Sequence, residues 1–109
     1  MRAEIQLKEK ARAMAQEICR DVFDTHVTLR VFQEIEKSLE LRTLYEDAIG
    51  SEGNARGNHT KARINRVLGS IIKVAVGGTA RTENGNRASI QVENEFVVNY
   101  TPLTPANAN

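Results

Sequence analysis

The sequence predicts a mainly α-helical fold that ends in a β-hairpin. Apolar residues recur at helical spacing in two long stretches, 3–23 and 59–76, and a period of two replaces that spacing further on. Asn84-Gly85, the strongest short hairpin signal, lies near this change. The 109 residues, 40% hydrophobic and 27% charged, suit one modest core. We expect an N-terminal helix over 1–24, a second unit over 25–101 and a flexible tail over 102–109.

The first predicted helix, residues 3–23, carries one narrow apolar stripe. Its members are Leu7, Ala11, Met14, Ala15, Ile18 and Val22. Such a stripe usually packs on the rest of its own domain. The spacing and the alanines also suit a seam between two helices that approach closely, and from this we predict a homodimer.

Two shorter helices are expected next. Residues 28–39 return to helical spacing. Thr43 and Glu46 match a capping box, in which the hydroxyl and the carboxylate satisfy each other's backbone donors, so a new helix should begin at Thr43 and end at Gly50. The glycine-rich residues 50–58 have no period and are predicted to be a loop, without the spacing of a nucleotide-binding P-loop.

The helix predicted over 59–76 concentrates the positive charge of the chain. Asn58 is its expected N-cap, and Gly77-Gly78 supply the left-handed residue that ends it. The apolar arc holds Ile64, Val67, Leu68, Ile71, Ile72, Val74 and Ala75, of which we expect Ile64, Leu68 and Ile71 to be buried. The opposite arc holds Arg63, Asn65, Arg66, Ser70 and Lys73, with Ala62 and Gly69 leaving the backbone free to approach a surface. A solvated helix usually mixes both signs, whereas this arc has no acid.

The basic character extends on both sides of this helix. Residues 54–87 contain seven Lys or Arg (Arg56, Lys61, Arg63, Arg66, Lys73, Arg81 and Arg87) against the single Glu83. Although the formal net charge is only +1, positive charge is concentrated in residues 54–87, so the charge distribution is dipolar.

After Gly78 the pattern predicts strands. Residues 79–83 should pair with 86–90 around an Asn84-Gly85 turn. A further strand is predicted up to residue 100, with its apolar side at even positions: Ile90, Val92, Phe96, Val98 and Tyr100. The tail has two prolines and no period, which indicates an extended or disordered segment.

The chain lacks the residue clusters that enzymes and metal sites need. His26 and His59 lie far apart, with no carboxylate at a fixed helical spacing, and the single Cys19 has no second cysteine. We therefore predict no catalytic residue, no metal and no cofactor. Without a membrane span or a signal peptide in the pattern, we expect a cytoplasmic protein with no membrane partner.

Three helices (28–39, 43–49, 59–76) followed by a hairpin resemble the winged helix-turn-helix proteins, over residues 28 to 100. The resemblance implies that the third helix enters the major groove of duplex DNA and that the hairpin is the wing. It indicates sequence-specific or general DNA binding by a small regulatory or accessory factor, for example in the regulation of transcription. The loop before the third helix is longer than in a tight helix-turn-helix.

The candidate DNA contacts follow from this placement. Arg63, Asn65, Arg66, Ser70 and Lys73 are expected in the groove, and Arg56, Lys61, Arg81 and Arg87 on phosphates. The alternative is a small protein–protein interaction module, of the phage or plasmid accessory type, whose basic helix grips an acidic surface of a host protein.

Overall fold

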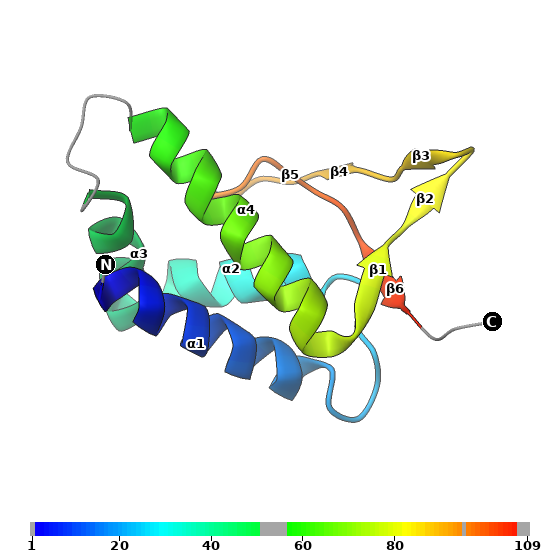
Figure 1. Ribbon diagram of the computed structural model, residues 1–109, viewed down its shortest axis with the longest axis horizontal. Coiled ribbons are helices and arrows are strands. Elements are labelled where there is room, and N and C mark those ends of the chain that lie inside the picture. Colours follow the sequence, from blue (N-terminus) through cyan, green and yellow to red (C-terminus); the bar gives the residue numbers. More distant parts are fainter. Residues whose placement is uncertain (1, 51–56, 95, 107–109) are drawn as a thin grey trace.

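Four helices and three short strand pairs make up the described part of the chain, which comprises residues 2–50, 57–94 and 96–106 of a computed structural model (Figure 1). The helices are α1 (Arg2–Ile18), α2 (Val27–Lys37), α3 (Leu39–Gly50) and α4 (Gly57–Val76). The strands are β1 (Gly78–Ala80), β2 (Thr82–Glu83), β3 (Asn86–Arg87), β4 (Ile90–Gln91), β5 (Asn99–Tyr100) and β6 (Leu103–Pro105). The predicted class, mainly helical with antiparallel strands at the C-terminal side, is confirmed.

All four helices share one hydrophobic core. The stripe of α1 contributes Leu7, Ala11 and Ala15, which are fully buried against the other helices of the same chain. The observation behind the predicted homodimer is thus explained by packing within the chain. Helix α1 thus belongs to the common core, while Val22 at the end of the predicted stripe is 76% exposed.

The first helix ends at Ile18, five residues before the predicted end. Beyond it, the Asp24 N–H donates to the Cys19 sulfur at 3.4 Å, and the Asp24 carboxylate accepts the His26 N–H at 2.8 Å. An Asp side chain that bonds the backbone two residues on stabilises a turn, which competes with helix propagation. The chain therefore turns into α2 here.

The start of α3 is also earlier than predicted, because Ser38 rather than Thr43 caps it. The Ser38 hydroxyl accepts the Leu41 N–H at 3.2 Å, which satisfies one free donor of the first turn. The Thr43 hydroxyl instead donates to the Leu39 carbonyl at 2.9 Å, inside the helix. The predicted capping box at Thr43 is therefore wrong.

The buried side of α4 is rotated from the predicted one. Ile64, Leu68 and Ile72 are fully buried, whereas Ile71 is only half-buried and Val74 is 77% exposed. Periodicity locates an apolar arc, but the neighbours α1, α2 and α3 decide which part of it they cover. The helix begins at Gly57, one residue before the predicted cap Asn58, and ends at Val76, after which Gly77 has the expected left-handed φ, 64°.

The strands pair differently from the prediction. The Asn84-Gly85 turn is confirmed, with φ of 52° and 81°, but its ladder is limited to β2 and β3. The predicted single strand ending at residue 100 is divided into β4 and β5, which pair with each other. Between them the Asn94 side chain accepts the N–H groups of Phe96 and Val97 at 2.7 and 3.1 Å and forms a turn.

The segment predicted as a flexible tail contributes a strand. β6 pairs antiparallel with β1, so that Gly78 lies opposite Pro105 and Ala80 opposite Leu103. Leu103 is buried in the core, and its N–H donates to the Thr25 carbonyl at 3.0 Å. Burial of this leucine fixes residues 102–106 beside the helices, and residues 107–109 lie outside the described part.

Candidate nucleic-acid interface

A groove lies between α4 and the segment that carries β5 and β6. Its volume is about 410 Å³. Five of the predicted contact residues line it: Asn65, Arg66, Ser70, Lys73 and Arg87. The remaining lining residues, which were not predicted as contacts, are Thr28, Phe32, Gly69, Ala80, Val97, Asn99, Tyr100, Thr101 and Leu103. The groove thus joins the outward side of α4 to the base of the β2–β3 hairpin.

Three cations surround this groove without a carboxylate partner. Arg66 and Lys73 approach from α4 and Arg87 from β3, and all three are exposed. Within the described residues, no carboxylate lies within ion-pair distance of any of them, and the groove lining contains no acid. Unpaired cations that converge on a concave surface raise the local concentration of anions.

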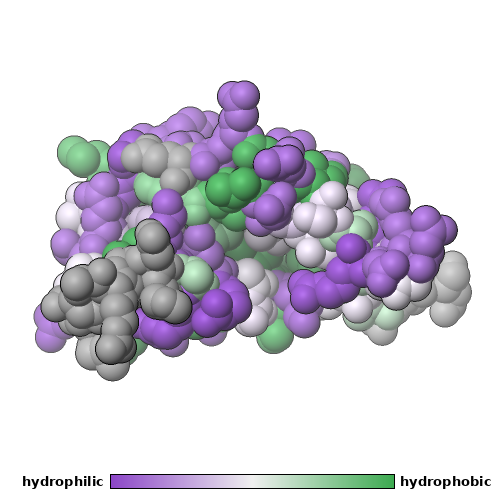
Figure 2. All heavy atoms as spheres, turned by 90° about the horizontal axis from the view of Figure 1, so that it is seen from above, coloured by the Kyte–Doolittle hydropathy of each residue, from purple (hydrophilic) through white to green (hydrophobic). Residues whose placement is uncertain are grey.

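The buried residues that line the groove are mostly apolar, with Thr28 as the polar exception. Phe32, Tyr100 and Leu103 are largely buried, and their edges line it together with Val97. Figure 2 looks down on this side of the molecule, where hydrophobic groups lie near the hollowed middle and hydrophilic groups flank them. A ligand that fits here needs both a negative charge and an apolar part.

Tyr100 is held in place from the side of α2. Its hydroxyl forms a hydrogen bond with Nδ1 of His26, just before α2, and the two rings meet edge to face. Burial, and secondarily the nearby Asp24 carboxylate, raises the pKa of Tyr100, so the hydroxyl keeps its proton at neutral pH. This contact connects β5 to the helical core and fixes one wall of the groove.

Asn65 occupies a different position from the predicted one. Its side-chain oxygen accepts the Tyr45 hydroxyl at 2.7 Å, and its amide nitrogen donates to the Phe96 carbonyl at 2.6 Å. Tyr45 is 1% exposed, and burial raises its pKa, which keeps the hydroxyl a donor. Asn65 therefore links α3, α4 and residue 96 while still lining the groove, and it is not an exposed base reader at the edge of the helix.

Arg63 is directed toward α1 and away from the groove. Its guanidinium donates to both carboxylate oxygens of Glu4, at 2.9 and 3.3 Å. These hydrogen bonds hold the pKa of Glu4 below its usual value. As expected, Arg63 has no acidic partner within its own helix, but the expected outward orientation toward a ligand is wrong, because Arg63 pairs with Glu4 of α1.

Two further predicted contacts, Lys61 and Arg81, do not line the groove. Lys61 is half-buried and interacts within the molecule, and Arg81 pairs with Glu83 at 3.7 Å on the hairpin. Arg56 falls outside the described residues. Sequence reasoning missed the wall formed by Asn99, Tyr100 and Thr101, because no local signal indicates that this segment lies beside α4.

In the described part of the chain, no three His, Cys, Asp or Glu side chains lie close enough together to hold a metal ion. The helices described there also lack the length and apolar composition of a membrane span. Comparisons of the chain with protein-family models, with curated proteins and with solved structures each gave no match.

Proposed function

We propose that the protein binds duplex DNA through the groove side of α4 and the β2–β3 hairpin. One observation carries the proposal: Arg66, Lys73 and Arg87 converge on one surface without any carboxylate partner in the described residues. Phosphate contacts by Lys and Arg supply most of the sequence-independent affinity for DNA. A cluster of unpaired cations on one surface is the electrostatic feature expected of a nucleic-acid-binding protein.

The outward side of α4 suits a helix that lies along DNA. Arg66 and Lys73 are two turns apart, about 10 Å along the axis, and Ser70 lies between them on the same side. All three are exposed, and Gly69 between them adds no bulk. Arg66 can reach base edges or phosphates, and Lys73 a phosphate.

The hairpin extends the same surface. In Figure 1, β2 and β3 project beyond the body of the molecule, to the side away from α1 and α3. Arg87 lines the groove and lies opposite Thr82, and Arg81 precedes Thr82 at the start of the hairpin. In our proposal the hairpin acts as a wing that contacts the DNA backbone beside α4, which is the role that a winged helix-turn-helix assigns to it.

The test is a double variant, Arg66→Ala with Lys73→Ala, measured by fluorescence anisotropy on random-sequence duplex DNA over a series of salt concentrations. The slope of log K against log salt should fall by about one unit for each charge removed. The free energy of unfolding should change by less than about 0.5 kcal/mol, since neither side chain loses an ion pair within the described residues.

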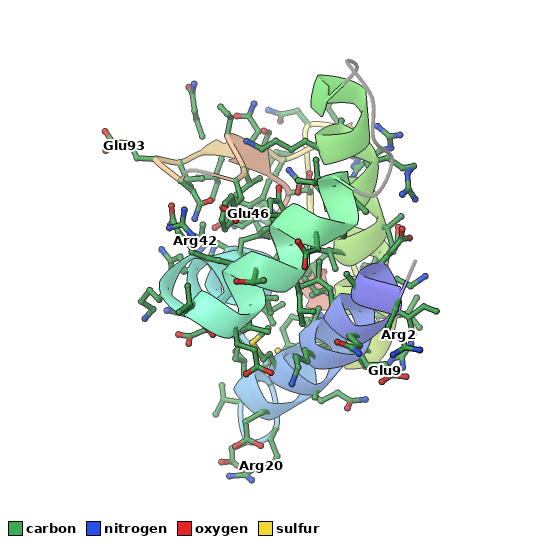
Figure 3. All side chains as sticks on the ribbon, turned by 90° about the vertical axis from the view of Figure 1, so that its left-hand side faces the viewer. Arg2, Glu9, Arg20, Arg42, Glu46 and Glu93 are labelled. Carbon is green, nitrogen blue, oxygen red and sulfur yellow. The ribbon has the colours of Figure 1, made fainter. Side chains whose placement is uncertain are left out.

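The matched control removes one Arg and one Lys elsewhere: Arg20→Ala with Lys37→Ala. Arg20 pairs with Glu17 at 3.4 Å and Lys37 with Glu34 at 3.2 Å, and Figure 3 shows Arg20 at the end of the molecule away from the strands. This variant has the same net charge but should keep the wild-type slope. Equal binding by the two double variants, or no binding by the wild type at low salt, contradicts the proposal. An acidic protein partner for the same surface is then the next hypothesis.

A further inference from the structure

We propose that the groove receives a single unpaired nucleotide of the bound DNA, with its phosphate on the three cations and its base against the apolar floor. This inference rests on the proposed DNA binding and deepens it. It predicts that DNA with an unpaired nucleotide binds more tightly than a fully paired duplex of the same length.

The first argument is size. A volume of about 410 Å³ lies in the range of roughly 300–1,000 Å³ that is usual for pockets that hold small ligands. A double helix is too wide to enter and can contact only the rim, where Arg66, Lys73 and Arg87 lie. Only a group of nucleotide size that leaves the duplex can reach Phe32, Tyr100 and Leu103 at the bottom.

The second argument is chemical complementarity. The cations come from two sides, Arg66 and Lys73 from α4 and Arg87 from the hairpin, so that a phosphate between them is held from both. The apolar floor gives a base the contact it loses when it leaves the stack. A nucleotide in DNA combines one negative charge with a flat ring whose faces stack on apolar side chains, which matches this division of the lining.

The third argument is a polar group already fixed at the groove. Asn65 uses one acceptor site on Tyr45 and one donor on Phe96, and an amide has two of each. One donor and one acceptor therefore remain on a side chain that two hydrogen bonds hold in place. Asn99, on the opposite wall, is exposed and offers a second amide for the base edge.

Gly69 provides a way to block the groove without removing any charge. It lines the groove between Arg66 and Lys73, and nothing lies within 4 Å of a Cβ built on it. A larger side chain therefore enters open space, and replacing a glycine inside a helix raises helix propensity. Gly69→Leu fills part of the groove, and Gly69→Ala is the matched control that leaves most of it open.

The experiment compares three DNAs of one length: a fully paired duplex, the same duplex with one bulged nucleotide, and the same bulge without its base. The wild type should bind the bulged DNA roughly tenfold more tightly than the paired duplex, and the abasic bulge should lose this preference. Gly69→Leu should bring the ratio of bulged-DNA to paired-DNA affinity close to one, whatever its effect on duplex binding itself, while Gly69→Ala should keep the wild-type ratio. Free nucleoside monophosphates, added as competitors, should reduce the binding of bulged DNA more than that of paired DNA.

Each contrary result has a separate meaning. If bulged, abasic and paired DNAs bind equally, or if Gly69→Leu keeps the preference, the nucleotide site is refuted while duplex binding stands. If the wild type binds none of the three DNAs at low salt, both proposals fail. A circular dichroism spectrum and an unfolding curve for Gly69→Leu establish that the variant is folded.

Discussion

The two sides of α4 differ in what their charged and polar groups contact. On the side toward the other helices, Arg63 pairs with Glu4 and Asn65 bonds Tyr45 and Phe96. On the groove side, Arg66 and Lys73 are exposed and contact no carboxylate of the described residues. One helix thus combines side chains that stabilise the fold with side chains that are available for a ligand.

The outer surface of α1 to α3 supports the same distinction. Lys10 pairs with Glu40 at 3.5 Å and Arg42 with Glu46 at 3.9 Å, and Figure 3 shows the latter two near one another on α3. Cations are therefore present on both surfaces, and at the groove three of them lie together with no carboxylate of the described residues within ion-pair distance. A basic residue can be assigned to a binding surface only after its contacts within the fold show that no carboxylate already pairs with it.

The two sides of α4 should differ most in how a substitution changes the free energy of unfolding, with the large effect on the buried side. Leu68→Ala should lower the free energy of unfolding by about 2–5 kcal/mol, because it leaves a cavity among α1, α3 and α4. Ser70→Ala, on the groove side, should change it by less than about 0.5 kcal/mol. Urea denaturation measures both. A loss below about 1 kcal/mol for Leu68→Ala means that the buried side of α4 is misplaced.

A smaller effect is expected at Asn65, where the two sides meet. Asn65→Ala should cost about 1–3 kcal/mol, because the buried Tyr45 hydroxyl and the Phe96 carbonyl lose their partner. In a Tyr45→Phe background the hydroxyl is already gone, so the same substitution should cost less. A double-mutant cycle by urea denaturation measures this coupling. Strictly additive costs contradict the hydrogen-bond network.

The smallest effect is expected at the Glu4–Arg63 pair, and it depends on pH. Since the folded pKa of Glu4 lies below its ordinary value of 4.5, the pair stabilises the fold above that pH, and this contribution is lost as the pH falls through the folded pKa. We expect about 0.5–1 kcal/mol, because the Arg63 side chain is 38% exposed. Glu4→Gln should flatten the stability curve below about pH 5.

The control for this pair is Glu46→Gln, at a carboxylate that is 63% exposed and 3.9 Å from Arg42. It should leave the acid limb of the stability curve nearly unchanged. If Glu4→Gln and Glu46→Gln behave alike in unfolding experiments at several pH values, the Glu4–Arg63 pair contributes no more than an ordinary surface pair.

Local signals in the sequence were sufficient for the order of the helices and for the Asn84-Gly85 turn. They failed where two nearby residues offer the same signal, as with Ser38 and Thr43, since only packing selects between them. They also failed for the partner of Arg63, because Glu4 lies 59 residues away. The groove was half predicted for the same reason: α4 supplies one wall from its own periodicity, while the other wall depends on the long-range pairing of β1 with β6.

The short strands have a consequence for how the molecule opens. The strands form three separate pairs of two or three residues each, and no pair is extended by a third strand in the described residues. Isolated two-stranded pairs are marginally stable in water, whereas the helices bury a continuous core. Local unfolding should therefore begin at the β2–β3 hairpin, whose strand residues are all exposed, while the helices and the wall that contains Tyr100 and Leu103 stay closed. The groove then has two fixed walls and one edge, at Arg87, that can open and reclose, which gives a ligand a way in that does not require the core to unfold.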